Sequence, residues 1–194
     1  MNFLGSLIML AVSLIILIFL MGLLYSRKKK KASQLSKIFA ACLLCMFIWI
    51  SSLMLQIIYQ NTSIDPVLFE GFASFGACYI PVALLLLGIS FSNTKIHFNW
   101  KYLLLFIIPT ITTFLMFTNH HHHLFYKVYS TNLDECVTGP YAIVHSLYSY
   151  LLIAIGLIYL LRYSIKNSGF FSKQSVLILV GSLIPVVINI LRNF

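Results

Sequence analysis

The sequence predicts an all-α membrane protein, a polytopic bundle of six transmembrane helices with its N-terminus outside the cell. Three observations lead to this prediction. The chain of 194 residues is 60% hydrophobic and only 9% charged, whereas a soluble domain carries about 25% charged residues. Six segments are apolar over roughly the 20 residues that a helix needs to cross a membrane. Finally, the basic residues are concentrated in alternate connections between these segments.

Short polar or charged connections separate the six expected spans. The spans cover approximately residues 3–25, 37–59, 66–91, 101–118, 140–161 and 174–191. We interpret all of them as helices, because backbone polar groups in lipid have to be paired within their own segment. Strands of membrane barrels are only about 9–11 residues long and alternate in polarity. Residues 1–194 are therefore predicted to form one membrane-embedded domain.

The first segment is predicted to be an uncleaved membrane anchor. A signal peptide has a basic start and an apolar core of about 7–15 residues. The apolar run of 3–25 is longer, and its charges follow it in the RKKKK run of residues 27–31. We interpret this run as a topology determinant, and it is also compatible with contact to anionic lipid.

The distribution of charge predicts the orientation. Eleven of the thirteen basic residues lie in the connections at 26–37, 92–101 and 162–173. The acidic residues fall on the other side, and they are Asp65, Glu70, Asp134 and Glu135. Because basic residues mark the cytoplasmic side of membrane proteins, the RKKKK run is predicted in the cytoplasm. The net charge of +9 therefore gives no indication of a nucleic-acid partner.

Polar residues gather near the predicted outer ends of the spans. Segment four ends in the run TNHHHHLFY at residues 118–126, and segment five starts at Pro140. In segment five one helical face carries Tyr141, His145, Tyr148, Ser149 and Leu152. Polar residues in a span rarely face lipid, so we expect this face to meet other helices or a water-filled cavity. The candidate ligand-binding residues at this level are Glu70, Asn119, His122, His123, His145, Tyr148 and Asn189.

Each candidate also has an explanation that needs no ligand. Tyrosines favour membrane interfaces, and His145 is able to form an ordinary hydrogen bond between helices. Successive residues of a helix diverge by about 100°, so the four consecutive histidines cannot all bind one ion. The spacing matches no standard zinc motif, and neither a metal nor another cofactor is predicted. The four cysteines, Cys42, Cys45, Cys78 and Cys136, indicate no disulfide framework.

The chain contains the motifs TNHHHHLFY, GPYAIVHSLYSY and QSVLILVGSLIPVVIN. Together they resemble one family, the N-terminal seven-helix sensor module of bacterial histidine kinases, which also precedes some diguanylate cyclases. The stretch FASFGACYIPVALLLLGISFS is similar to the third helix of that family, with Pro81 in the expected place. The matching positions are Thr118, Asn119, His122 or His123, Gly139, Pro140, His145, Tyr148, Tyr150, Gln174, Pro185 and Asn189.

The resemblance implies a sensor in the bacterial plasma membrane. Such a module detects an extracellular or lipidic ligand and, in a homodimer, relays the signal to a cytoplasmic kinase or cyclase domain. The family also has a seventh helix, whereas this chain ends at Phe194 without an ATP-binding, phosphoacceptor or GGDEF-type sequence. We therefore expect either a fragment or a stand-alone relic, and no enzymatic activity of its own.

Two other classes of function stay open from the sequence. A small membrane peptidase could use Cys78 with His97, or Cys136 with His145, as a nucleophile and base. The predicted topology separates the first pair and places the second pair on one side. A transporter usually contains internal repeats, and none is convincing here.

Overall fold

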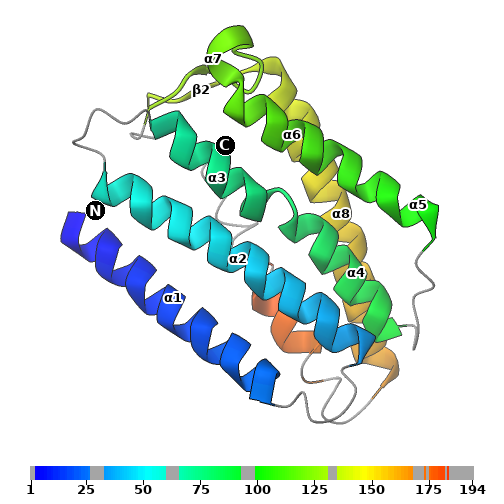
Figure 1. The fold of residues 1–194 in the computed structure, drawn as a ribbon. Coiled ribbons are helices and arrows are strands. Elements are labelled where there is room, and N and C mark those ends of the chain that lie inside the picture. Colours follow the sequence, from blue (N-terminus) through cyan, green and yellow to red (C-terminus); the bar gives the residue numbers. More distant parts are fainter. Residues whose placement is uncertain are drawn as a thin grey trace.

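The protein is a bundle of long, side-by-side helices (Figure 1). The computed structural model describes residues 3–26, 33–59, 66–92, 99–130, 135–167, and 173–183 except 174 and 182. In chain order its elements are α1 (Phe3–Ser26), α2 (Gln34–Ile58), α3 (Pro66–Ala77), α4 (Ile80–Ser92), α5 (Trp100–Leu103), the 3₁₀ helix η2 (Leu104–Phe106), α6 (Ile107–Phe117), α7 (Asn119–His122), β1 (Tyr126–Val128), β2 (Val137–Thr138) and α8 (Pro140–Lys166).

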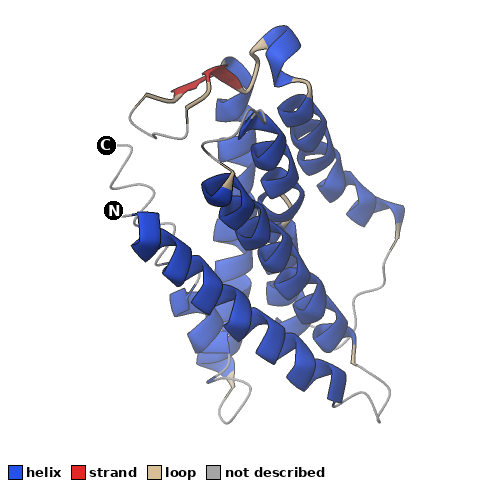
Figure 2. Ribbon diagram, turned by 60° about the vertical axis from the view of Figure 1, so that its left-hand side comes forward, coloured by secondary structure: helices blue, strands red, loops and turns tan. Residues whose placement is uncertain are grey.

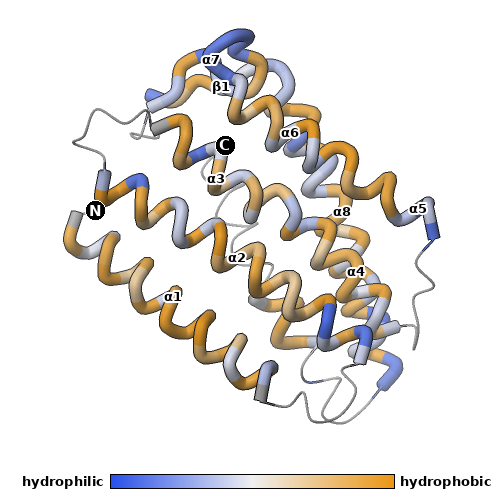
Figure 3. Tube along the Cα trace, viewed as in Figure 1, coloured by the Kyte–Doolittle hydropathy of each residue, from blue (hydrophilic) through white to orange (hydrophobic). Residues whose placement is uncertain are grey.

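The predicted membrane bundle is confirmed. Within the described residues, five helical stretches are long and apolar enough to cross a membrane: Leu4–Tyr25, Gln34–Ile58, Val67–Ser92, Trp100–Phe117 and Pro140–Lys166. Hydrophobic residues run along the helices, and hydrophilic residues gather at the two ends of the bundle (Figure 3). Large apolar side chains face outward, as lipid-facing residues do. Residues 175–181 are helical where the sixth span is expected, and Gln174, Pro185 and Asn189 lie outside the described residues.

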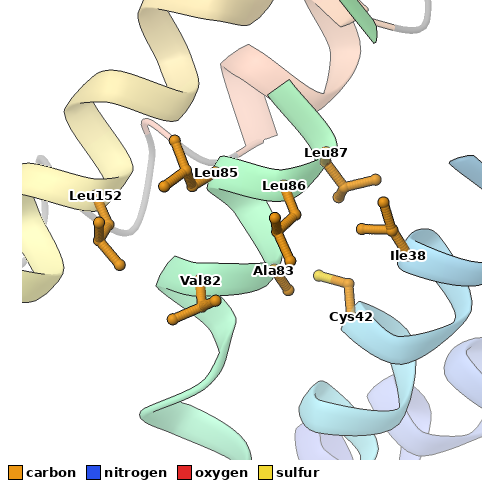
Figure 4. Close-up of a cluster of buried hydrophobic side chains, with 8 residues drawn as sticks. All are labelled: Ile38, Cys42, Val82, Ala83, Leu85, Leu86, Leu87 and Leu152. Atoms are coloured by element: carbon orange, nitrogen blue, oxygen red, sulfur yellow. The ribbon is translucent and has the colours of Figure 1, made fainter. Parts of the chain in front are cut away.

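Helix α4 forms the centre of the bundle. Its side chains pack against Ile38 and Cys42 of α2 on one side and Leu152 of α8 on the other (Figure 4). Nine of the thirteen residues of α4 are buried, and Val82 is only 1% exposed. This explains why its sequence is apolar all round and not amphipathic.

Glycines allow α4 and α8 to approach closely. A Cβ atom added to Gly88 of α4 would lie 2.5 Å from the carbonyl oxygen of Gly156 in α8. Close backbone approach at small residues is a common way to join helices in membranes, where burial from water does not drive their association.

Prolines interrupt two of the spans. The third span, expected over residues 66–91, is divided at Cys78 and Tyr79 into α3 and α4, and Pro81 lies in the first turn of α4. In the fourth span, Pro109 follows the 3₁₀ turn η2. Proline removes the hydrogen bond that its N–H would donate to the carbonyl four residues earlier. Both irregularities therefore arise where the sequence places a proline inside a span.

The connection between α6 and α8 covers one end of the bundle. It contains the short helix α7 and a two-stranded antiparallel sheet of β1 and β2 (Figure 2). Tyr126 is paired with Thr138 and Val128 with Val137. We call residues 118–139 the α6–α8 connection.

Candidate functional site

Asn119 organises the α6–α8 connection. Its side chain is buried, and its Oδ1 accepts hydrogen bonds from the backbone N–H groups of Phe125 at 3.1 Å and Tyr126 at 3.0 Å. Its Nδ2 donates to the carbonyl oxygen of Tyr126 at 2.9 Å. The side chain thus pairs with Tyr126 much as a neighbouring strand would. Asn119 closes a loop that returns the chain toward α8.

His122 holds the same turn from the other side. Its Nδ1 accepts from the backbone N–H of Leu124 at 3.0 Å, so Nδ1 carries no proton. The Nε2–H then donates to Thr118 Oγ1 at 3.0 Å, while the Thr118 hydroxyl donates to the carbonyl of Phe114. This pattern assigns His122 as a neutral imidazole protonated on Nε2.

The remaining histidines of the run have different positions. His120, His121 and His123 are exposed, and the rings of His120 and His121 have their centroids 3.7 Å apart. His123 adopts a left-handed conformation with φ of 53° and ends α7. Of the four, only His122 has a side-chain hydrogen bond within its own turn in the described part of the chain.

The start of α8 fits against this turn. Gly139 is buried and its N–H donates to the carbonyl of Phe125 at 2.7 Å, and the N–H of Tyr141 donates to the carbonyl of Leu124 at 3.0 Å. A Cβ on Gly139 would lie 2.2 Å from the Leu124 oxygen, so a larger residue does not fit. Pro140 follows in the first turn of α8, where its missing N–H has no helical partner to lose.

A polar network joins the connection to two helices. Glu70 of α3 accepts hydrogen bonds from the hydroxyls of Tyr126 at 3.3 Å and Tyr129 at 3.4 Å. Gln56 of α2 donates to the Tyr129 hydroxyl through its Nε2. We call Gln56, Glu70, Tyr126 and Tyr129 the Glu70 network. It links α2, α3 and the α6–α8 connection through side chains alone.

The two tyrosines of this network are held in their neutral form. Burial raises the pKa of Tyr126, and the negative charge of Glu70 raises it further. Burial and then Glu70 raise the pKa of Tyr129 in the same way. A phenol that stays protonated beside a carboxylate is a hydrogen-bond donor over the whole physiological pH range.

His145 of α8 faces α6. Its Nδ1 is 3.0 Å from Thr112 Oγ1 and its Nε2 is 3.3 Å from Ser149 Oγ. Thr112 donates its own proton to the carbonyl of Ile108 at 2.8 Å, so the Nδ1–H of His145 is the donor to Thr112. The ring of Phe125 packs against the imidazole with centroids 5.9 Å apart.

Tyr148 has a structural partner away from this group. Its hydroxyl donates to the carbonyl of Leu105 at 2.6 Å. That carbonyl lies four residues before Pro109 and has therefore lost its helical donor. Tyr148 satisfies the backbone group that Pro109 leaves free.

The structure thus divides the predicted site residues into groups. Asn119, Glu70 and His145 gather around Phe125 and Tyr126 of the connection. Asn119 binds the backbone of both residues, Phe125 contacts His145, and Tyr126 binds Glu70. Tyr148 is separate, His123 is exposed, and Asn189 lies outside the described residues. The helical face predicted for α8 faces other helices: Tyr141 and His145 contact Thr112 of α6, Tyr148 binds Leu105 of η2, and Leu152 packs against α4. Ser149 contacts His145 within α8.

Several contributing residues were not predicted from the sequence. Thr112, Gln56, Tyr126 and Tyr129 all supply hydrogen bonds at this end of the bundle. One signal was available: Glu70 is a carboxylate inside an apolar segment, and such a group in a membrane span requires a polar partner. Two tyrosines three residues apart in the connection are suitable donors.

Neither metal binding nor the Cys–His pairs gain support from the geometry. In the described part of the chain, no group of three or more His, Cys, Asp or Glu side chains is placed to hold a metal ion. His145 already uses both ring nitrogens toward Thr112 and Ser149 and is not positioned as a base for Cys136. Cys78 is buried, and His97 lies outside the described residues.

A comparison with protein families agrees with this architecture. A family model described as the N-terminal 7TM region of histidine kinase matches residues 9–194. The chain belongs to this family. No curated protein and no solved structure matches it. Membership in the histidine kinase 7TM family identifies the chain as a sensory transmembrane module.

In this member of the 7TM family, motifs that are distant in sequence meet in one place. Thr118 and Asn119 end the fourth span, whereas Gly139 and Pro140 begin the fifth. The Asn119 side chain binds the backbone of Phe125, and the N–H groups of Gly139 and Tyr141 donate to the carbonyls of Phe125 and Leu124. Together these residues turn the chain back tightly across the end of the bundle.

Proposed function

We propose that the chain detects an extracellular or membrane signal at the α6–α8 connection and, in a full-length parent, relays it to a cytoplasmic kinase or cyclase domain. The observation that carries this proposal is the Glu70 network. Because Tyr126 and Tyr129 bind Glu70, and Gln56 binds Tyr129, a displacement of the connection acts directly on α2 and α3.

The predicted ligand-binding residues take two roles in this proposal. His123 is exposed on the connection, where a ligand has access to it. Asn119 and His122 hold the connection through hydrogen bonds, and His145 packs against Phe125. We expect these contacts to change when the connection moves. A ligand shifts the packing only if it binds one arrangement of the connection more tightly than the other. Such differential binding is what would transmit a signal to the helices.

The proposed orientation has the N-terminus and the α6–α8 connection outside the cell. The basic residues support it, since Arg162 and Lys166 lie at the end of α8 remote from the connection. Alkaline phosphatase fused within residues 131–134 should be active in bacterial cells. The same enzyme fused within residues 168–172 should be inactive, and the reverse result would contradict the orientation.

Substitutions in the Glu70 network test the relay. In a full-length kinase that carries this module, Tyr129→Phe removes the hydroxyl that joins Gln56 to Glu70. We expect the variant to change basal output of a response-regulator reporter several-fold while the protein level in the membrane stays constant. Lys127→Gln, an exposed change in the same connection, is the control and should behave like the parent. Unchanged output and unchanged response in Tyr129→Phe, Glu70→Gln and His123→Ala together would reject the site.

A further inference from the structure

The end of the bundle opposite the α6–α8 connection contains an apolar groove. It has a volume of about 350 Å³, within the range of about 300–1,000 Å³ that is common for ligand sites. Its walls include Lys37, Ala41 and Cys45 of α2, Ala83 and Leu86 of α4, and Phe106 of η2. We call it the α2–η2 groove.

The groove exists because small side chains and a proline-induced irregularity coincide. Ala41 and Ala83 leave space between α2 and α4 that larger residues would fill. Phe106 belongs to the 3₁₀ turn that precedes Pro109, and its ring packs against Tyr79 with centroids 6.1 Å apart. This contact holds Phe106, which forms the wall of the groove opposite α2. Ala41 is exposed, so the groove opens on the outer surface of the bundle, where lipid surrounds a membrane protein.

One end of the groove carries a positive charge. Lys37 is exposed in the first turns of α2, and it also borders a second hollow of about 570 Å³ between α1 and α2. The two carboxylates in the described part of the chain are both engaged with the α6–α8 connection and not with the groove. Glu70 accepts hydrogen bonds from its tyrosines, and Glu135 accepts one from Ser130. In the sequence, the RKKKK run of residues 27–31 precedes α2.

We propose that the α2–η2 groove binds an anionic phospholipid, with one acyl chain along Ala41, Ala83 and Leu86 and the phosphate at Lys37. The apolar lining suits an acyl chain, and the cation of Lys37 suits a negatively charged headgroup. A lysine at a helix end extends its ammonium to the interface while its methylene stem covers apolar surface. Assignment of this lipid to the cytoplasmic leaflet rests on the orientation proposed above, but binding itself does not.

Native mass spectrometry of the purified chain tests the proposal. The probes are dioleoyl phosphatidylglycerol, which is anionic, and dioleoyl phosphatidylcholine, which has the same acyl chains and no net charge. The unmodified chain should prefer the anionic lipid. Lys37→Gln should weaken phosphatidylglycerol binding about fivefold, the factor that one cation contributes near an anionic surface, and should leave phosphatidylcholine binding unchanged. Ala41→Phe fills the groove and should weaken both lipids several-fold.

Matched variants control for charge and size. Lys127→Gln removes a cation in the α6–α8 connection, and Ala154→Phe adds the same ring at an exposed site of α8. Neither should alter lipid binding. If Lys37→Gln keeps the preference for phosphatidylglycerol, or Ala41→Phe binds both lipids as the unmodified chain does, the proposal is wrong. If the purified chain is dimeric and Ala41→Phe dissociates the dimer without a change in bound lipid, the proposal is also wrong. The groove would then be a contact with a second copy of the chain.

A measurement without substitution covers the case in which Ala41→Phe does not fold. Cys45 lines the groove, and Cys136 lies in the α6–α8 connection. Phosphatidylglycerol should slow alkylation of Cys45 by a membrane-permeant maleimide several-fold, as measured by peptide mapping. The rate at Cys136 should not change. Equal rates at Cys45 with and without the lipid would contradict the proposal.

Discussion

Asn119 is a single buried amide that satisfies three backbone groups of the loop that follows it. Asn119→Ala would leave the N–H groups of Phe125 and Tyr126 without this partner, and an unpaired buried donor costs about 1–3 kcal/mol. We expect the free energy of unfolding in detergent to fall by about 2 kcal/mol. His121→Ala, at an exposed position of the same run, should change it by less than about 0.5 kcal/mol. Equal stability of the two variants would contradict this role for Asn119.

Tyr148 and Pro109 form a pair that can be tested as a pair. Tyr148→Phe removes the donor to the Leu105 carbonyl, and we expect a loss of about 1–2 kcal/mol in the free energy of unfolding. In Pro109→Ala the restored N–H is able to donate to the same carbonyl. Tyr148→Phe should therefore cost much less in a Pro109→Ala background. Thermal unfolding of the four proteins gives the coupling energy, and strictly additive losses would show that the two residues act separately.

At the scale of elements, the contact between α4 and α8 depends on Gly88 and Gly156. A side chain at Gly88 meets the Gly156 backbone at 2.5 Å, and backbone cannot move aside as a flexible side chain can. Gly88→Leu should lower the free energy of unfolding by about 3 kcal/mol or prevent assembly of the bundle. Gly22→Leu in α1 is the matched control, because a Cβ at Gly22 has no neighbour within 4 Å. A similar melting temperature for both variants would contradict the close packing of α4 and α8.

The elements differ in how far the sequence predicts them. Hydropathy places the spans well, because the requirement to pair backbone groups in lipid makes long apolar runs helical. Pro81 and Pro109 predict irregular positions, but not the full division of the third span at Cys78 and Tyr79. The strands β1 and β2 have only three and two residues. A period-2 pattern cannot be recognised over so short a length.

The candidate site shows the same limit. Asn119, His122 and Gly139 were singled out because they match motifs, and the structure gives each a defined place in the turn. Thr112 and Gln56 were missed, because their partners lie on other helices and no local periodicity encodes a contact between distant segments. The sequence indicated that Glu70 needs a partner, but not that Tyr126 and Tyr129 would supply it.

At the scale of the whole molecule, the Glu70 network should make the folded protein less stable at alkaline pH. Tyr126 and Tyr129 have raised pKa values in the folded protein, whereas an unfolded tyrosine titrates near pH 10. Above about pH 10 the unfolded chain loses these protons first, so the free energy of unfolding falls as pH rises. We expect a steeper fall between pH 9 and 11 in the unmodified chain than in Tyr126→Phe combined with Tyr129→Phe. Denaturant unfolding in detergent measures it, and Tyr25→Phe, at an exposed residue of α1, is the control.

The division of the third span has a mechanical consequence. Helix α3 contacts the α6–α8 connection through Glu70, and α4 is packed against α8 through Gly88. A continuous helix would carry a twist from one end of the membrane to the other as a stiff rod. We expect the interruption at Cys78 and Tyr79 to let α3 and α4 rotate relative to each other, with Tyr79 hydrogen-bonded to Thr110 of α6 at 3.0 Å. Amide hydrogen exchange should therefore be faster at residues 78–80 than in the middle of α3 or α4, and uniform protection from 70 to 90 would indicate that the span turns as one rigid shaft.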